Sequence, residues 1–465
     1  MRVHFIGICG TAMATLAALF KQKGVDVQGS DQDVYPPMSE FLAAEGIPTL
    51  SGFRAEHITG DLDLVVVGNA ISRGNVELEE VLDRKVRYCS LPEAIRDHFL
   101  WNAHSIVIAG THGKTTTTSL TAWVLTHAGK DPSALIGGIA LNFGPAGSSY
   151  RFGKGRDFVI EGDEYDSAFF DKSAKFLKYL PDIAVINNIE FDHADIYADL
   201  EAVRLAFRRL VNLVPRAGLL LLGADSPDAA ALRGLAKSRV ESFGLSDDTD
   251  WQGDIVEASG VGTTIDVRYK GAFFGQFTVP LLGEHNVRNT LAAIAVAHAA
   301  GVDQGTMAEG LWTFKGVKRR LEVIGTARGV TVVDDFAHHP TAIAETLAGV
   351  RRANPSRRIW AVFEPRSASS CRRVFQKDFA GAFRGADEVV LAAVFRSTLP
   401  PGERLSVDEL IADLTAGGQH ARSVPEIPAI VDTLTRECRD GDLVILLSNG
   451  GFGGIHRLLL QALQS

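Results

Sequence analysis

The stretch IAGTHGKTTTTSL (residues 108–120) decides how the middle of this chain folds. It follows a short β-branched run and places Gly110 and Gly113 immediately ahead of a lysine. Glycines let backbone N–H groups converge on an anion with no Cβ in the way. The threonine-rich continuation predicts a helix over 114–128, whose positive N-terminal end points at the same anion. The stretch therefore predicts a strand, a phosphate-binding loop and a helix.

The side chains of this loop indicate a nucleotide triphosphate with Mg²⁺. Lys114 can reach the β- and γ-phosphates, and the Thr115 hydroxyl can bind Mg²⁺. The usual consensus has a glycine where this chain has Ile108, so the loop is a shortened variant. An accidental GKT in a strand–turn–helix is the alternative, but the preceding strand and the distant acidic residues favour ATP. The residues predicted to contact ATP here are Gly110, Thr111, His112, Gly113, Lys114, Thr115 and Thr116.

Polar side chains also follow two other hydrophobic runs. Glu161 closes the run 158–160, and phosphate loops commonly need such an acid to help hold magnesium. A solvated acidic turn is the alternative, and it explains less well why the acid ends a buried-looking strand. Asp192 and His193 follow the run 183–186. A lone histidine is usually a surface or core residue, so His193 is of interest only because it lies at a further strand end.

The same alternation of β-branched runs and helical patterns extends outward over the whole chain. It predicts parallel α/β sheets, whose ligands lie at the carboxyl ends of the strands. The predicted strands include 3–6, 64–67, 105–109, 158–160, 183–186 and 330–333. The segment 250–280 alternates like antiparallel strands. We predict three domains, at 1–100, 101–318 and 319–465.

Composition limits the function classes. The 465 residues carry a net charge of −9, which argues weakly against broad nucleic-acid binding. The four cysteines are scattered and form no CxxC pair, which argues against a disulfide framework and against a zinc site. The N-terminus lacks the apolar run of a signal peptide, and no apolar segment approaches the ~20 residues that cross a bilayer. We therefore expect a cytoplasmic protein with no membrane association.

The N-terminal sequence VHFIGICGTAM has the strand–glycine–helix layout of a dinucleotide fold, with Cys9 at the place of the middle glycine. Asp31 ends the next predicted strand, 25–30, where it could hold a ribose hydroxyl. The pattern is compatible with NAD, with another nucleotide, or with a helix packed closely on a sheet.

Several later segments also combine polar residues with strand or helix ends. The residues of GEHNVRN (283–289) precede a predicted helix at 290–300 and could simply cap it. Arg319 and Arg320 lie near a presumed hinge, where an arginine could reach a phosphate on closure. The segment 332–343 holds two acids and two histidines ahead of Pro340, which suits the first position of a helix.

Taken together, these motifs resemble the Mur ligase family almost end to end. They are, in order, GTHGKTTTTS, EGDE, NNIEFDH, GEHNVRN, GVKRRLE and DDFAHHP. The resemblance implies a Rossmann-like N-terminal domain, a central P-loop ATPase-type α/β domain with a small antiparallel sheet, and a Rossmann-like C-terminal domain. It also implies an ATP- and Mg²⁺-dependent ligase that forms amide bonds in cell-wall synthesis and recycling.

Other motifs resemble one branch of this family, which joins UDP-N-acetylmuramate to the recycled tripeptide L-alanyl-γ-D-glutamyl-meso-diaminopimelate. They are GICGTAM, GSDQDVYPPMS, NAISRGN, AFFDKSAKF, EFDHADIY, EPRS and SNGGFGGIH. The alternative is the branch that adds L-alanine alone. The partners implied are these small molecules, and we expect a monomer or a weak homodimer.

The resemblance also implies roles for individual residues. For ATP it adds His285, Asn286 and Asn289 on the adenine side, Arg320 at the phosphates and Asp335 at the ribose. For metal it implies that Thr115 and Glu161 hold one Mg²⁺ and that His193 binds a second ion, and the residues implied in catalysis are Lys114, Glu161, His193 and Arg320. For the UDP-sugar it implies Gly10, Thr11, Met13, Asp31, Asn69, His112 and Asn142. For the acceptor peptide it implies His338, His339, Arg366 and Ser367.

The chain departs from the Mur ligase family in one feature, and two other functions are alternatives to a ligase. Several branches of the family have a carbamylated lysine on the helix after the DH motif, and here the matching place falls at or near Phe207. No carbamate is therefore expected. A NAD-dependent oxidoreductase is opposed by the missing middle glycine and the intact GKT loop. A regulatory nucleotide-binding module is opposed by the magnesium-type acids and a complete third domain.

Overall fold

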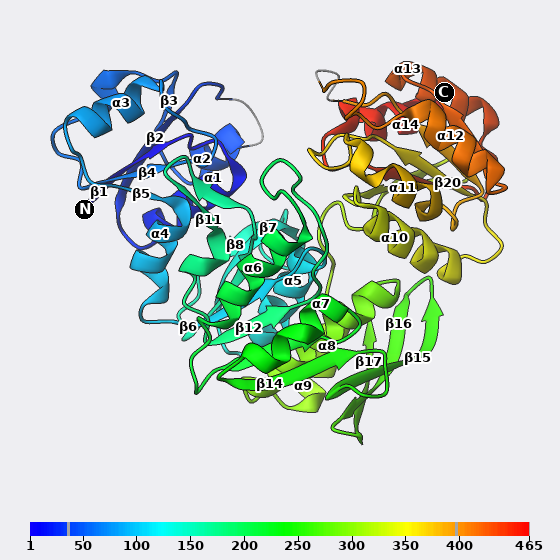
Figure 1. The fold of residues 1–465 in the computed structure, drawn as a ribbon, viewed down its shortest axis with the longest axis horizontal. Coiled ribbons are helices and arrows are strands. Elements are labelled where there is room, and N and C mark those ends of the chain that lie inside the picture. The colour runs from blue at the N-terminus through cyan, green and yellow to red at the C-terminus, as the bar shows by residue number, and fades with distance from the viewer. Residues whose placement is uncertain (35–37, 396–398, 465) are drawn as a thin grey trace.

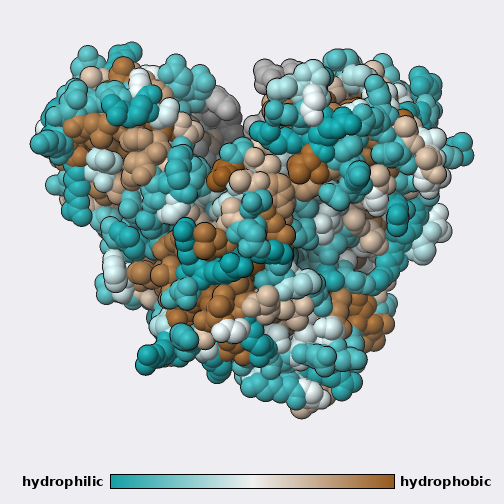
Figure 2. All heavy atoms as spheres, in the orientation of Figure 1, coloured by the Kyte–Doolittle hydropathy of each residue, from teal (hydrophilic) through white to brown (hydrophobic). Residues whose placement is uncertain are grey.

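The computed structural model describes residues 1–34, 38–395 and 399–464, and folds them into three α/β domains (Figure 1). The N-terminal and C-terminal domains stand on the two sides of the central domain, and a notch separates them in the space-filling view (Figure 2). The predicted α/β class with three domains is confirmed. The motif at 29–39 lies only partly within the described residues. No helix of the described residues is long and apolar enough to span a bilayer.

The N-terminal domain is a five-stranded parallel sheet in the order β3-β2-β1-β4-β5, which is the strand order of a dinucleotide-binding fold. Its strands are β1 (Arg2–Ile6), β2 (Asp26–Asp31), β3 (Thr49–Ser51), β4 (Leu64–Val67) and β5 (Tyr88–Ser90). Its helices are α1 (Thr11–Gln22), α2 (Met38–Ala44), α3 (Val76–Asp83) and α4 (Leu91–Ile95), with short turns at Ala55–His57 and Arg96–Leu100.

The central domain contains a ten-stranded sheet, ordered β17-β16-β15-β14-β13-β12-β6-β9-β7-β8. Its strands are β6 (His104–Ala109), β7 (Ser133–Ala140), β8 (Ser148–Arg151), β9 (Asp157–Gly162), β12 (Ile183–Ile186), β13 (Leu219–Gly223), β14 (Arg239–Gly244), β15 (Trp251–Ser259), β16 (Gly262–Tyr269) and β17 (Ala272–Val279). A two-stranded ribbon, β10 (Asp166–Ala168) and β11 (Asp171–Ala174), lies apart from it. The helices are α5 (Lys114–His127), α6 (Leu200–Val211), α7 (Pro227–Ala230), α8 (Glu284–Ala299) and α9 (Gln304–Trp312). The turns are Lys175–Lys178 and Ala231–Leu235.

The antiparallel strands expected at 250–280 are present as β15–β17, and they continue the main sheet because β15 pairs in parallel with β14. One detail of the central domain differs from the sequence expectations. The helix predicted at 290–300 begins earlier, at Glu284, and Gly283 is its N-cap with no capping side chain. His285 and the two asparagines therefore lie inside the first turns of α8 and do not cap it.

The C-terminal domain is a six-stranded sheet in the order β18-β19-β23-β20-β21-β22, parallel except for β18. Its strands are β18 (Glu322–Ala327), β19 (Val330–Asp335), β20 (Ile359–Phe363), β21 (Glu388–Leu391), β22 (His420–Ser423) and β23 (Leu443–Leu447). Its helices are α10 (Pro340–Ala353), α11 (Gln376–Ala382), α12 (Val407–Ala416), α13 (Ile427–Glu437) and α14 (Ile455–Gln464), with turns at Arg373–Phe375 and Phe452–Gly454. Pro340 is the first residue of α10, as predicted.

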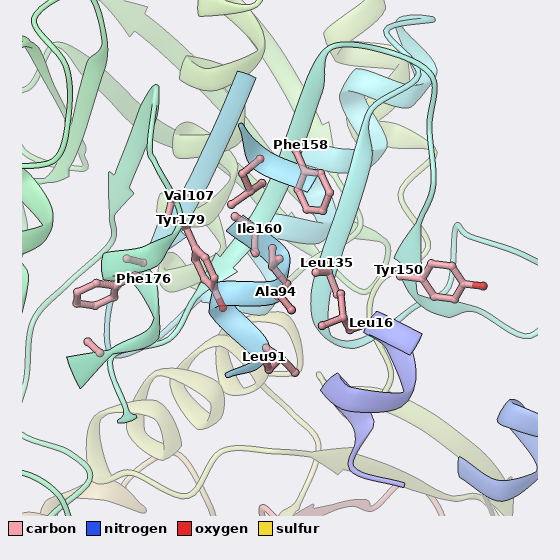
Figure 3. Packing of buried hydrophobic residues seen from close by; sticks show 14 of the residues in the cluster. Leu16, Leu91, Ala94, Val107, Leu135, Tyr150, Phe158, Ile160, Phe176 and Tyr179 are labelled. Atoms are coloured by element: carbon pink, nitrogen blue, oxygen red, sulfur yellow. The ribbon is translucent and has the colours of Figure 1, made fainter. Parts of the chain in front are cut away.

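The N-terminal domain shares a hydrophobic core with the central domain. Figure 3 shows Leu16 of α1 and Leu91 and Ala94 of α4 among central-domain side chains such as Leu135 and Ile160. Burial of apolar area is worth ~25 cal/mol per Å², so a shared core holds two domains together strongly. The contact between the central and C-terminal domains includes ion pairs, with Arg288 to Glu345 at 2.8 Å and Arg352 to Glu284 at 2.7 Å. The C-terminal domain is therefore the one better suited to move.

Candidate active site

One cleft of about 1200 Å³ is lined by all three domains. The predicted site residues that line it are Thr11, Thr111, His112, Gly113, Lys114, Thr115, Thr116, Glu161, His193, His285, Asn286, Asn289, Arg320, Asp335, His338, His339 and Ser367. The cleft lies at the carboxyl ends of β6, β9 and β12, where ligands of parallel sheets bind. Residues distant in the sequence are thus gathered around one space.

The phosphate loop has the geometry that its glycines require. Gly113 has φ +81°, and a Cβ there would lie 2.3 Å from Asn289 Oδ1 and 2.8 Å from Asn187 Nδ2. Lys114 Nζ is turned back into its own loop, donating to Gly110 O and to Glu164 Oε2, each at 2.8 Å. Burial opposes the charged lysine, but the carboxylates of Glu164, Asp163 and Glu161 outweigh it and raise the pKa of Lys114. Lys114 is therefore a cation held inside the cleft.

Replacing Gly113 with alanine should weaken nucleotide binding with little effect on the other substrates. The added Cβ would strain a positive-φ residue and displace the Asn289 amide. We expect the KM for ATP to rise by at least about tenfold, which corresponds to roughly 1.4 kcal/mol. Gly129, with φ +70° and open space around its Cβ position, offers the matched control. An unchanged KM for ATP in Gly113→Ala would contradict the role of this loop.

Two asparagines at the end of β12, missed as site residues by the sequence analysis, brace the loop from the side. Asn188 Oδ1 accepts the His112 backbone N–H at 2.8 Å. Asn187 Nδ2 donates to His112 O at 3.3 Å and to Thr117 Oγ1 at 3.2 Å, while its buried Oδ1 has no hydrogen-bond partner. The sequence feature that could have identified them is the pair of asparagines directly after a buried strand.

Acidic residues surround the start of α5. Glu161 accepts the Thr115 hydroxyl at 2.9 Å and the Gly137 backbone N–H at 2.7 Å. Burial, followed by the charge of Asp163, raises the pKa of Glu161. A buried carboxylate beside a hydroxyl is an oxygen donor set of the kind that Mg²⁺ prefers, and an uncompensated negative charge favours a cation. The residues present therefore fit a magnesium ion.

Glu164, the last residue of the EGDE motif, links Lys114 to His193. Its Oε1 lies 3.2 Å from His193 Nε2. Burial opposes both charges, but the pairing outweighs it, lowering the pKa of Glu164 and raising that of His193. A metal-binding histidine must be neutral, so the proton on His193 has to leave before it can bind an ion. Metal binding through His193 would therefore strengthen as pH rises.

His285 presents an unpaired nitrogen on the side of the cleft assigned to adenine. The residue is half-buried, its buried Nδ1 atom has no hydrogen-bond partner among the described residues, and desolvation together with Arg288, Arg320 and His112 lowers its pKa to about 3. Asn289 Nδ2 donates to Asn286 Oδ1 at 3.0 Å, and Asn286 Nδ2 donates to Leu282 O at 2.8 Å. A neutral ring with an open nitrogen fits a nucleobase edge.

Arg320 and Asp335 lie together at the hinge. The Arg320 guanidinium lies over the Phe336 ring, 5.0 Å from its centroid. Asp335 accepts the backbone N–H groups of Leu321 at 2.7 Å and Ala337 at 2.8 Å, and burial raises its pKa despite Arg320. The carboxylate of Asp335 thus ties the hinge segment to the end of β19. Its role at a ribose stays a prediction.

The residues assigned to the UDP-sugar lie mostly away from the cleft. Thr11 lines it, but Gly10, Met13, Asp31 and Asn69 do not. Asp31 Oδ2 accepts the Cys9 backbone N–H at 2.8 Å, so it shapes the glycine turn of the N-terminal domain. Asn69 Nδ2 donates to Asp166 Oδ1 at 3.2 Å, across to the central domain.

Asn142 also lies outside the cleft lining, and its amide is already engaged. It donates to Thr313 O at 3.0 Å and accepts the Lys315 backbone N–H at 2.7 Å. It therefore joins two loops of the central domain. Its contact with a muramyl group stays a prediction.

The residues assigned to the acceptor lie at the carboxyl ends of β19 and β20. His339 is the N-cap of α10, where its side chain accepts the Thr341 backbone N–H. Ser367 lines the cleft, whereas Arg366 does not. The Arg366 guanidinium lies 3.7 Å from the Phe395 ring centroid, and a Cβ on Gly450 would overlap it. Arg366 is thus a flat cation held between a ring and a glycine.

The helix α6 carries no lysine, and Phe207 lies at or near the place where the family resemblance would put one. Phe207 is fully buried there and packs against the Phe176 ring at a centroid distance of 5.2 Å. A carbamate on this position is thereby excluded.

Comparison with known proteins identifies the domains by sequence. The chain matches the models for the Mur ligase family catalytic domain at residues 2–100, the Mur ligase middle domain at 108–297, and the Mur ligase glutamate ligase domain at 319–450. It is 40% identical over 464 residues to the UDP-N-acetylmuramate–L-alanyl-γ-D-glutamyl-meso-2,6-diaminoheptandioate ligase of Escherichia coli K12, covering 100% of this chain and 98% of the relative.

Two solved structures resemble the chain over its whole length. A murein peptide ligase from Psychrobacter arcticus 273-4 has a TM-score of 0.73 at 36% identity and covers 100% of this chain and 99% of its own. A UDP-N-acetylmuramate–alanine ligase from Thermotoga maritima has a TM-score of 0.81 at 26% identity, with the same coverage. The two measures rank these structures differently. A TM-score over three domains also reflects how far the domains are closed, so sequence identity is the better guide to the substrate.

Proposed function

The chain belongs to the Mur ligase family and is an ATP-dependent ligase that forms amide bonds, and we propose that it joins UDP-N-acetylmuramate to L-alanyl-γ-D-glutamyl-meso-diaminopimelate. This reaction belongs to peptidoglycan recycling, and its need for ATP is consistent with a cytoplasmic enzyme. The observation that carries the proposal is the 40% identity over the whole chain to the tripeptide-adding ligase of Escherichia coli K12. One cleft supports the ligase chemistry, because it brings the phosphate loop, the acidic residues and side chains of the C-terminal domain together.

The chemistry requires activation of an acid. A carboxylate does not react with an amine at neutral pH, because its leaving group is poor. In the proposed reaction the lactyl carboxylate of UDP-N-acetylmuramate attacks the γ-phosphorus of ATP, which gives an acyl phosphate and ADP. The alanine amine of the tripeptide then attacks the acyl carbon and loses a proton, and the resulting tetrahedral intermediate releases phosphate as the amide forms.

The residues of this chain bind and orient the reactants. Lys114 and the loop N–H groups would hold the β- and γ-phosphates, and Arg320 would add a second cation when the C-terminal domain closes. His285 and its neighbouring asparagines would hold the base. Thr115, Glu161 and His193 would bind Mg²⁺, which neutralises phosphate charge when bound.

The acceptor can be identified directly with a substrate panel. Purified protein would be given Mg-ATP, UDP-N-acetylmuramate and either the tripeptide or free L-alanine, and the products would be identified by mass. We expect phosphate release that requires both donor and acceptor, with the tripeptide as the preferred acceptor. Turnover with L-alanine but not with the tripeptide would contradict the proposal and indicate the alanine-adding reaction.

Replacing Arg366 with alanine should impair the acceptor selectively. A guanidinium that Phe395 holds in place suits a carboxylate of the acceptor. The tripeptide carries several carboxylates, whereas free alanine carries one. We expect the KM for the tripeptide to rise about tenfold or more while that for ATP changes little. Arg373→Ala is the matched control, because it removes an exposed arginine of the nearby turn Arg373–Phe375. An equal rise in both Michaelis constants would contradict an acceptor role.

A further inference from the structure

Three side chains with metal-binding atoms meet at the border between the central and C-terminal domains. His112 comes from the phosphate loop, Glu190 follows β12, and His339 precedes α10. Their ligand atoms all lie within 4.8 Å of one another, and among the residues that the structure describes no other group of histidine, cysteine or acidic side chains meets this condition. All three line the cleft, and Glu190 remains 33% exposed, so an ion can enter.

The hydrogen bonds of His339 fix which of its nitrogens is unprotonated. Its Nδ1 accepts the Thr341 backbone N–H at 3.3 Å, and its Nε2 lies 3.2 Å from the carbonyl oxygen of Phe191, to which it can only donate. Because Nδ1 accepts an N–H and Nε2 donates to a carbonyl, the ring is neutral and carries its proton on Nε2. The Nδ1 atom also lies 3.5 Å from Glu190 Oε2, so an ion bound between these two atoms would replace the Thr341 N–H at Nδ1.

The spacing of the ligand atoms around Glu190 is compatible with a bound cation. Glu190 Oε2 also lies 3.3 Å from His112 Nε2 and accepts the Thr341 hydroxyl at 2.7 Å. Zinc–nitrogen and zinc–oxygen bonds of about 2.0–2.1 Å at the tetrahedral angle separate ligand atoms by roughly 3.3–3.4 Å. The two distances to Glu190 agree with this spacing. The bond from His339 Nε2 to a backbone carbonyl is also the outer contact that metal-binding histidines usually make.

We propose that His112 Nε2, Glu190 Oε2 and His339 Nδ1 form a binding site for a divalent transition-metal ion such as Zn²⁺, with a fourth position open to the cleft. Two imidazoles and one carboxylate suit Zn²⁺ better than Mg²⁺, which prefers oxygen ligands. The site shares no ligand with the predicted magnesium set of Thr115, Glu161 and His193. It draws its ligands from two domains, so a bound ion would hold these domains at their present separation.

The site has a consequence that depends on the proposed function. His112 and His339 are predicted to contact the substrates, and an ion that ties them to Glu190 would compete with that contact. We therefore expect micromolar Zn²⁺ to inhibit the ligase in the presence of excess Mg²⁺. Binding of the ion itself does not depend on the proposed function and can be measured without any substrate.

The test uses Co²⁺ as a spectroscopic probe on the full chain without nucleotide. Four-coordinate Co²⁺ with imidazole ligands gives an intense visible band, whereas Co²⁺ among six oxygens gives a weak one. We expect the intense band at a stoichiometry of one ion per chain, and displacement of Co²⁺ by added Zn²⁺ but not by Mg²⁺. Glu190→Gln and His339→Ala should each weaken Co²⁺ affinity by about 100-fold or more and remove the band.

Control variants separate this site from others. His193→Ala removes a ligand of the predicted magnesium set and should leave the Co²⁺ band unchanged. Unchanged circular dichroism would establish that Glu190→Gln and His339→Ala remain folded. A band that survives both substitutions, or that is lost only in His193→Ala, would overturn the proposal, as would the absence of an intense band in the unmodified chain. If the unmodified enzyme ligates the tripeptide but shows no intense Co²⁺ band, the metal site is wrong and the proposed function stands.

Discussion

Replacing Lys114 with alanine should lower kcat/KM by roughly 10²–10³-fold, because a preorganised charge at the transferring phosphate is worth about 3–4 kcal/mol. In the nucleotide-free structure Lys114 Nζ is bonded to Gly110 O and to Glu164 Oε2. A triphosphate in the loop would offer this cation new anionic partners within the same cleft. Steady-state kinetics with coupled detection of ADP would measure the loss. Turnover close to that of the unmodified enzyme would contradict the assignment of the loop.

Lost stability must be separated from lost catalysis in this variant. Among the described residues, the buried Glu164 carboxylate has Lys114 and His193 as ion-pair partners, and Lys114→Ala removes the first of them. A buried charge that loses its partner destabilises a fold. The double variant Lys114→Ala/Glu164→Gln removes both charges and should recover much of the melting temperature without recovering activity. Lys237→Ala, an exposed lysine of the same domain, should leave both unchanged.

Local patterns were sufficient to predict much of the fold. The run at 64–67 forms β4, and the helix predicted over 114–128 forms α5, which ends at His127 with Gly129 in the left-handed region beyond it. These elements depend on hydrophobic runs, glycines and β-branched residues, which are properties of adjacent positions. The start of α8 was misplaced because its N-cap is a glycine at φ +92°, with none of the side chains that usually indicate a helix start.

The partners of site residues could not be predicted in the same way. Glu164 was one of several acids in a short run, and only the fold selects it as the partner of Lys114, 50 positions away. Glu190 gave no signal, because its contacts are His112 on another strand end and His339 in another domain. Such contacts depend on how the strands are ordered and how the domains pack. The sequence of a single chain does not specify these directly.

Asn142 illustrates what a motif match leaves open. The family resemblance assigns it to the muramyl group, which stays a prediction, and in the structure both ends of its amide bind backbone at 313–315. A motif match transfers a residue type and a place in the chain, whereas a role also depends on which neighbours the side chain meets. Arg366 is a milder case, since it lies beside the cleft, held by Phe395, rather than in its lining.

Replacing Glu161 with glutamine should reduce activity strongly and yet stabilise the metal-free protein. Glutamine can still accept the Gly137 N–H and can donate to the Thr115 oxygen, so both hydrogen bonds have a replacement. The carboxylate charge that Mg²⁺ requires is lost, and we expect kcat/KM to fall by about 100-fold or more. Thermal melting with and without Mg²⁺ should show that the stabilisation by the ion is also lost.

The stability gain of this variant should depend on pH, and its sign follows from the raised pKa of Glu161. A carboxyl group whose pKa is higher in the folded state holds its proton more tightly there than in the unfolded chain. Its ionisation therefore costs stability as pH rises above the ordinary carboxyl pKa, and this cost is largest above the folded-state pKa. In buffer with EDTA, Glu161→Gln should melt at a higher temperature than the unmodified protein near neutral pH, and the difference should shrink toward acidic pH. A lower melting temperature at neutral pH would mean that the Glu161 charge stabilises the empty cleft, which would contradict the view that this acid is buried there in order to hold a cation.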